Sequence, residues 1–172
     1  MASEDQLPVA PHTASEFYTW LWYQSEKNES RFDLGGDIGK IELWVDDRLA
    51  FRLPDSPKPS AVLTGENPST SMEARAALLG GKVVHDLRLA IRRDDREFGV
   101  TLKGATLDLQ RAKIPQAIEG TSEEALHDRM FLYEELTAIL GALFREFAKL
   151  RTSKAWGKTT LPAIRKWVAA QT

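Results

Sequence analysis

A run of basic residues near the C-terminus of this 172-residue sequence contains no acid. Exposed lysine and arginine side chains neutralise phosphates and release counterions, and hydroxyl side chains such as Ser153 and Thr159 can add hydrogen bonds to phosphate oxygens. A tryptophan within such a run can stack on a sugar or a base. The run therefore predicts a nucleic-acid contact, made by Lys149, Arg151, Lys154, Trp156, Lys158, Arg165 and Lys166.

The same run has a second interpretation, in which it serves the fold. Lys149 and Arg151 would then lie in the last turn of a long helix, where cations interact favourably with the negative end of the helix dipole. Trp156 would fill part of the core. The sequence alone leaves both interpretations open.

A second basic set lies on the polar face of a predicted sheet and consists of Arg88, Arg92 and Lys103. We include these residues as candidate DNA contacts. Acids share the same surface, so the alternative is that they neutralise the bases pairwise. Those acids are Asp86, Glu97 and Asp108.

The sequence lacks the signatures of common enzyme sites. Gly157-Lys158-Thr159 resembles the end of a phosphate-binding loop, but Thr152 stands where the first glycine belongs, and a predicted helix precedes it. The three histidines are far apart in sequence, and there is no cysteine to bind a metal or act as a nucleophile. We therefore expect no catalytic residues, no metal and no cofactor.

Two further polar residues are expected to be structural. His85 lies on the apolar face of a predicted strand, which favours a hydrogen-bonded core histidine over a ligand. Glu134 and Glu135 lie at the edge of an apolar helical stripe, and we expect both to be solvated.

Charge is unevenly distributed along the chain. Residues 1–73 hold 13 acids and 6 bases, a net charge of −7, whereas residues 74–172 hold 12 acids and 17 bases, a net charge of +5. This asymmetry favours an anionic partner for the second half.

The chain length predicts one folded domain at residues 13–172, after a disordered lead at residues 1–12. No apolar run approaches the roughly 20 residues of a membrane span, and the first residues lack the pattern of a signal peptide. We therefore expect a cytoplasmic protein without membrane contact, and the expected DNA binding would make it nucleoid-associated.

Alternating apolar residues predict antiparallel strands. Residues 40–53 predict a hairpin that turns at Asp46-Asp47, and residues 61–64 predict a short strand. Residues 82–110 predict a three-stranded meander with one apolar face.

Helical periodicity predicts a helix at residues 13–25 and a short helix ending at Gly80-Gly81, with Met72, Ala76 and Leu79 inward. The strongest helix begins at Ser122 and carries a continuous apolar stripe to Leu150. A last helix covers residues 160–170. The predicted fold is α+β, with the hairpin and meander packed on the long C-terminal helix and with flanking helices.

Two helices carry more apolar side chains than one buried face needs. In the long helix, Phe131, Ile139 and Phe144 widen the stripe, and this predicts an isologous homodimer. In the first helix we expect Trp20 in the core and Trp22 partly exposed or at an interface.

The order of the segments also carries a family resemblance. FYTWLWYQSE, GGKVVHDLRLAI, REFGVTLKG and DRMFLYEELTAILGALF follow one another within residues 15–150. In this order they resemble the C-terminal half of the bacterial recombination-associated protein RdgC family, with the best single match at Gly81–Leu89. The resemblance implies a dimeric, non-enzymatic DNA-binding protein that encircles duplex DNA with little sequence preference and restrains the RecA recombinase. It assigns no individual contact residue.

The expected function is sequence-independent DNA binding linked to recombination or replication. Duplex DNA, a second copy of the chain and a recombinase are the expected partners. The alternative is a protein-interaction or homodimerisation module that does not bind DNA.

Overall fold

The computed structural model describes residues 13–115 and 122–170, so the predicted lead at residues 1–12 lies outside the described residues. Within them, a six-stranded antiparallel sheet has helices on one face, which confirms the predicted α+β class. Its central order is β1 (Arg31–Asp33), β2 (Lys40–Arg52), β4 (Val83–Arg93), β5 (Arg96–Lys103) and β6 (Asp108–Lys113). β3 (Pro59–Thr64) pairs with the second half of β2, on the edge that β1 occupies in the first half.

The predicted hairpin at residues 40–53 is wrong, because β2 is one continuous strand. Val45 pairs with Leu89 and Leu49 pairs with Leu87, so residues 46–48 of β2 lie opposite a single residue of β4. The Asp46-Asp47 pair thus lies in a bulge and not in a turn. Since the strand continues beyond the bulge, Leu49 is as fully buried as Leu43.

The predicted meander is confirmed as β4, β5 and β6, with Asp94-Asp95 in the first turn. Side chains alternate between its two faces. Leu87, Leu89 and Ile91 belong to the core beneath the helices, whereas Arg88 and Arg92 lie on the opposite face.

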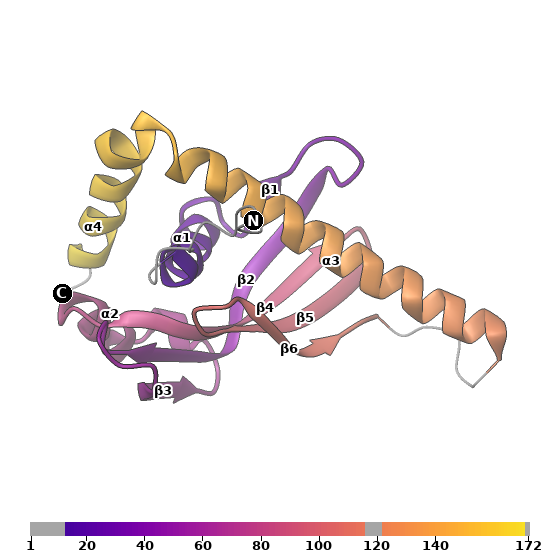
Figure 1. Cartoon of the computed structure of the whole chain (residues 1–172), viewed down its shortest axis with the longest axis horizontal. Coiled ribbons are helices and arrows are strands. Elements are labelled where there is room, and N and C mark those ends of the chain that lie inside the picture. Colours follow the sequence, from indigo (N-terminus) through magenta and orange to yellow (C-terminus); the bar gives the residue numbers. More distant parts are fainter. Residues whose placement is uncertain (1–12, 116–121, 171–172) are drawn as a thin grey trace, which may run out of the picture.

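The first helix, α1 (Thr13–Lys27), lies between the sheet and the two C-terminal helices (Figure 1). It is therefore covered on nearly all sides. Trp20 is 6% exposed, which confirms the prediction that it is in the core. Trp22 is 0% exposed, and its prediction is wrong because Trp167 packs edge-on against its ring with centroids 5.0 Å apart.

The long helix, α3 (Glu123–Arg151), begins where predicted, with the Ser122 side chain accepting a hydrogen bond from the Ala125 backbone N–H. Its C-terminal half packs on α1, while its N-terminal half runs past the end of the sheet (Figure 1). Ile139 is buried, so it cannot contribute to the exposed surface predicted for a dimer. Phe131 is 64% exposed, and Phe144 is partly buried against Phe17.

The short helix α2 (Met72–Leu79) follows a single 3-10 turn at Pro68–Thr70 and ends at Gly80, close to the predicted position. Its predicted inward face is wrong. Met72 is 77% exposed and Leu79 is also exposed, whereas Ala74 and Arg75 are buried. The helix packs on α4 (Leu161–Ala169), and the Arg75 guanidinium lies 4.1 Å from the centre of the Trp167 ring.

Candidate nucleic-acid interface

The predicted basic run spans the end of α3, a π-helical segment at Trp156–Thr160, and α4. α3 ends within this run, where side chains cap its last carbonyls. The Thr152 hydroxyl donates to the Ala148 carbonyl, and the Ser153 hydroxyl donates to the Leu150 carbonyl. The chain then reverses into α4, so the segments that carry the bases meet at one corner of the helical layer (Figure 1).

Two residues of the run serve the fold. Trp156 is 7% exposed and packs edge-on against Phe147, with ring centroids 5.6 Å apart. It is therefore not available to stack on a base, and its prediction as a DNA contact is wrong. The Arg151 guanidinium lies over the Trp156 ring, and its Nε donates to Glu16 Oε2 of α1 at 2.5 Å. Trp156 thus fills part of the core, as the second interpretation expected, whereas Arg151 is ion-paired with α1.

The other five bases form a surface that we call the basic corner. All five are exposed, and none of their side chains forms a hydrogen bond or ion pair with another described residue. Residues 149–166 contain no acid, and the nearest acid in sequence is Glu146, three residues before Lys149 on α3. The basic corner consists of Lys149, Lys154, Lys158, Arg165 and Lys166.

One carboxylate of α1 holds α4 in position. Glu26 accepts hydrogen bonds from the Trp167 indole at 2.7 Å, from Arg75 Nη2 at 2.5 Å and from the Trp22 indole at 2.9 Å. The sequence analysis did not identify Glu26 or Arg75. The Trp22–Glu26 spacing of four residues places both side chains on one helix face and is the only sequence signal we find for the arrangement.

One of the three bases on the sheet, Arg92, is ion-paired with acids, as the alternative interpretation expected. Arg92 lies between Glu42 at 3.6 Å and Glu97 at 3.2 Å, and its guanidinium covers the Trp44 ring. Lys103 is half-buried and pairs in register with Asp86 on one side and Asp108 on the other.

Arg88 is held by the backbone of the sheet. Its Nη1 donates to the Arg111 carbonyl at 2.6 Å and to Thr101 Oγ1 at 3.3 Å. The guanidinium lies directly over Gly99, where a Cβ atom would come within 2.6 Å of Nη2. Arg88, Arg92 and Lys103 thus lie on the outer face of the sheet, away from the helices, and do not join the basic corner.

Glu135 is buried, so the expectation that it is solvated is wrong. It accepts hydrogen bonds from Arg93 Nη1 at 2.8 Å and from Arg96 Nη2 at 2.5 Å. Burial raises the pKa of this carboxyl, but the hydrogen bonds from Arg96 and Arg93 outweigh burial and hold the pKa below its ordinary value. The hydrogen bonds from Arg93 and Arg96 to Glu135 thus connect the β4–β5 turn to the middle of α3.

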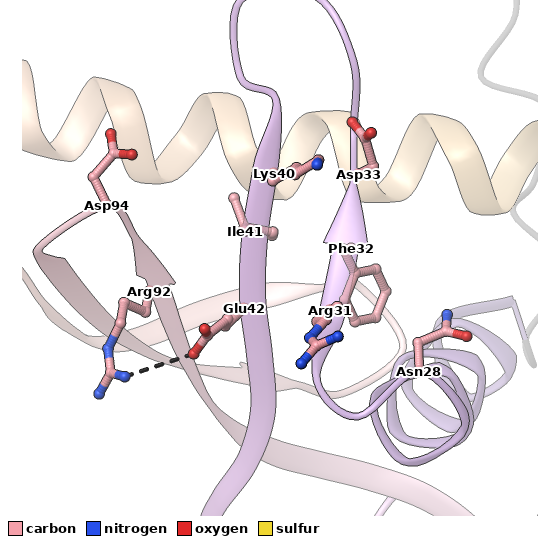
Figure 2. Close-up of a pocket in the computed structure, with 9 residues that line it drawn as sticks. All are labelled: Asn28, Arg31, Phe32, Asp33, Lys40, Ile41, Glu42, Arg92 and Asp94. Carbon is pink, nitrogen blue, oxygen red and sulfur yellow. Dashed lines mark ion pairs between the residues drawn. The ribbon is translucent and has the colours of Figure 1, made fainter.

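A pocket of about 590 Å³ lies beside β1 and the first half of β2 (Figure 2). Three bases and three acids line it, so no single charge sign dominates. Arg31 pairs in register with Glu42, which in turn pairs with Arg92. This alternation of charges across three strands gives the pocket no preference for a polyanion. The charged lining residues are Arg31, Lys40, Arg92, Asp33, Glu42 and Asp94.

His85 is a buried, hydrogen-bonded histidine, as predicted. Its Nδ1 lies 2.8 Å from Asp86 Oδ1, and Asp86 Oδ2 accepts from Arg48 Nε at 2.6 Å. Within residues 13–115 and 122–170, no group of three or more histidine, aspartate or glutamate side chains could hold a metal ion. No helix in the same ranges has the length and apolarity to cross a bilayer.

Comparisons with known proteins identify no relative. No protein-family model matches this sequence, and no curated protein and no solved structure matches it. The resemblance to the RdgC family therefore stays a prediction.

Proposed function

We propose that this chain is a non-enzymatic, sequence-independent DNA-binding protein that contacts duplex DNA through the basic corner. The observation that carries the proposal is the group of five exposed bases that have no acidic partner among the described residues. Each base that neutralises a phosphate releases counterions, and this release supplies most of the free energy of non-specific binding.

The composition of the basic corner supports contacts to phosphates rather than to bases. Asparagine and glutamine, which read adenine through paired hydrogen bonds, are absent from residues 149–166. The one aromatic side chain of the π-helical segment, Trp156, is buried. A surface of four lysines and one arginine positions a duplex without reading its sequence.

The biological context of the proposal comes from the RdgC resemblance alone. It places DNA binding in recombination or replication and makes a recombinase the proposed protein partner. DNA binding itself rests on the charges and does not depend on that context.

The test is a fluorescence-anisotropy titration with a labelled duplex at several salt concentrations. For each phosphate contacted, the logarithm of affinity falls with the logarithm of salt concentration at a slope of about −0.9. The double variant Lys154→Ala, Lys158→Ala should weaken binding equally for unrelated sequences and flatten the slope by up to about 2. Its stability should barely change, because exposed lysines contribute little to folding.

The matched control removes two lysines from the outer face of the sheet, in the variant Lys103→Ala, Lys113→Ala. This variant should keep the parent affinity and slope. If instead the Lys154 and Lys158 variant binds with the parent affinity and slope, the basic corner is not the site.

A second candidate function is homodimerisation, which one specific observation favours. The N-terminal half of α3 exposes four large apolar side chains. Contiguous apolar surface of this kind marks interfaces more often than free surface. The four side chains are Leu126, Met130, Phe131 and Tyr133.

A further inference from the structure

A second pocket, of about 290 Å³, lies at the C-terminal end of β2, whereas the pocket in Figure 2 lies at its N-terminal end. The proline-rich loop after β2, the start of β4 and the β5–β6 turn form its walls. A cavity of about 150 Å³ is enough to hold benzene. The pocket therefore has room for a small organic molecule. Its walls include Pro54, Asp55, Ser56, Pro57, His85 and Ala105.

A second bulge in the sheet directs His85 toward this pocket. Ala50 pairs with Asp86 and Phe51 pairs with Val84, so His85 has no partner residue on β2. In a regular strand the side chains of residues 85 and 86 would point to opposite faces. The bulge allows them to meet, and the imidazole is bonded to its neighbour's carboxylate.

The hydrogen bonds of this pair fix which ring nitrogen carries the proton. Asp86 is fully buried and its other oxygen is bonded to the Arg48 guanidinium, which favours the ionised carboxylate. An ionised carboxylate only accepts hydrogen bonds, so the proton lies on His85 Nδ1. In the neutral imidazole Nε2 is then the acceptor, and no described residue is bonded to it.

The walls of the pocket that His85 lines are held by buried side chains. Arg52 Nη1 donates to the carbonyls of Pro54 and Ser56, which fixes the proline-rich loop. The Tyr18 hydroxyl donates to the Gly104 carbonyl at 2.7 Å and fixes the β5–β6 turn. The pocket thus presents one oriented acceptor in a preformed, partly apolar cavity.

We propose that this pocket binds a small hydroxyl compound, an alcohol or a phenol, whose O–H donates to His85 Nε2. Pro54, Pro57 and Ala105 pack against its apolar body. Arg52 and Asp55 carry opposite charges in the pocket wall, so a neutral ligand is favoured over an anion or a cation.

The first measurement is the tautomer of His85, by long-range ¹H–¹⁵N correlation on uniformly ¹⁵N-labelled full-length protein. We expect protonated Nδ1 and unprotonated Nε2 at neutral pH. Phenol is then titrated, with benzene as a probe of similar size that lacks the hydroxyl. We expect phenol to shift the Nε2 resonance and to bind roughly two- to tenfold more tightly than benzene, the factor that one hydrogen bond contributes.

The matched variants are His85→Phe, which removes the acceptor, and Asp55→Asn, which alters only the pocket rim. His85→Phe should abolish the preference for phenol over benzene, and Asp55→Asn should keep it. A protonated Nε2, an Nε2 resonance that saturating phenol leaves unchanged, or equal affinities for phenol and benzene would overturn the proposal. These outcomes are read on the parent protein, so they stand even if His85→Phe does not fold, and they are independent of DNA binding.

Discussion

At the scale of single residues, contacts within the folded protein distinguish the charged side chains that stabilise the fold from those that remain available to bind a ligand. Arg151 is bonded to Glu16, and Arg88 is bonded to the backbone of β6. Lys154 and Lys158 are exposed and have no partner among the described residues. The same residue type therefore has two roles, and contacts made in the folded protein decide between them.

Glu135 gives a pH-dependent prediction at this scale. Because its native pKa is lowered, its ion pairs stabilise the protein above the unfolded value of about 4.5 and are lost as the pH falls through the native pKa. Glu135→Gln should lower the free energy of unfolding at pH 7 by about 1–3 kcal/mol. This is less than the 3–5 kcal/mol of a fully buried pair, because Arg93 and Arg96 are partly exposed.

Urea denaturation of parent and variant at pH 7 and at pH 3 measures this difference. The stability difference should shrink at pH 3, where the parent carboxyl becomes protonated. An equal difference at both pH values would show that packing, and not charge, accounts for the contribution of Glu135.

At the scale of elements, α4 is a short helix whose position depends on a few side chains. Ile164 is buried, and Trp167 packs against Trp22 and Arg75. Glu26 connects these three groups through its carboxylate. Since Arg165 and Lys166 lie on α4, the geometry of the basic corner depends on a carboxylate that is not part of it.

We predict that Glu26→Ala loosens α4 and weakens DNA binding, although no base is changed. Removing the acceptor leaves two indole N–H groups and Arg75 without their shared partner, at a cost of about 1–3 kcal/mol. Hydrogen exchange should rise in α4 and stay unchanged in β4 and β5, and the affinity for the duplex should fall. Glu29→Ala, which removes an exposed acid close in sequence, is the control. Unchanged exchange in α4 would contradict the anchoring role of Glu26.

At the scale of the whole molecule, polar and apolar surfaces are separated in space. The basic corner lies at the C-terminal end of α3, and the exposed apolar side chains lie toward its N-terminal end (Figure 1). A 29-residue helix is about 43 Å long, so the two surfaces lie several turns apart. A second copy bound at one end would therefore leave the basic corner at the other end accessible to DNA.

We predict a homodimer that Phe131→Asp converts to a monomer. A charge in the middle of an apolar interface is costly to bury, whereas the folded monomer tolerates it because Phe131 is exposed. Sedimentation at tens of micromolar measures the change. Met72→Asp, at an exposed apolar residue of α2, should leave the dimer intact. A monomeric parent protein at these concentrations would contradict the prediction.

Patterns local in sequence determined the fold class, the meander and the long helix. They are the period-2 alternation of β4 and β5, the turn at Asp94-Asp95 and the Ser122 cap, each formed by residues close in sequence. The concentration of bases without acids in residues 149–166 is likewise a property of the sequence.

The tertiary structure decided what covers each side chain, because burial depends on elements distant in the chain. Trp22 is buried by α4, Glu135 by the β4–β5 turn, and Trp156 by Phe147. The Asp46-Asp47 pair favours a turn locally, but the pairing of β2 with β3 and β4 on its two edges holds it within one strand.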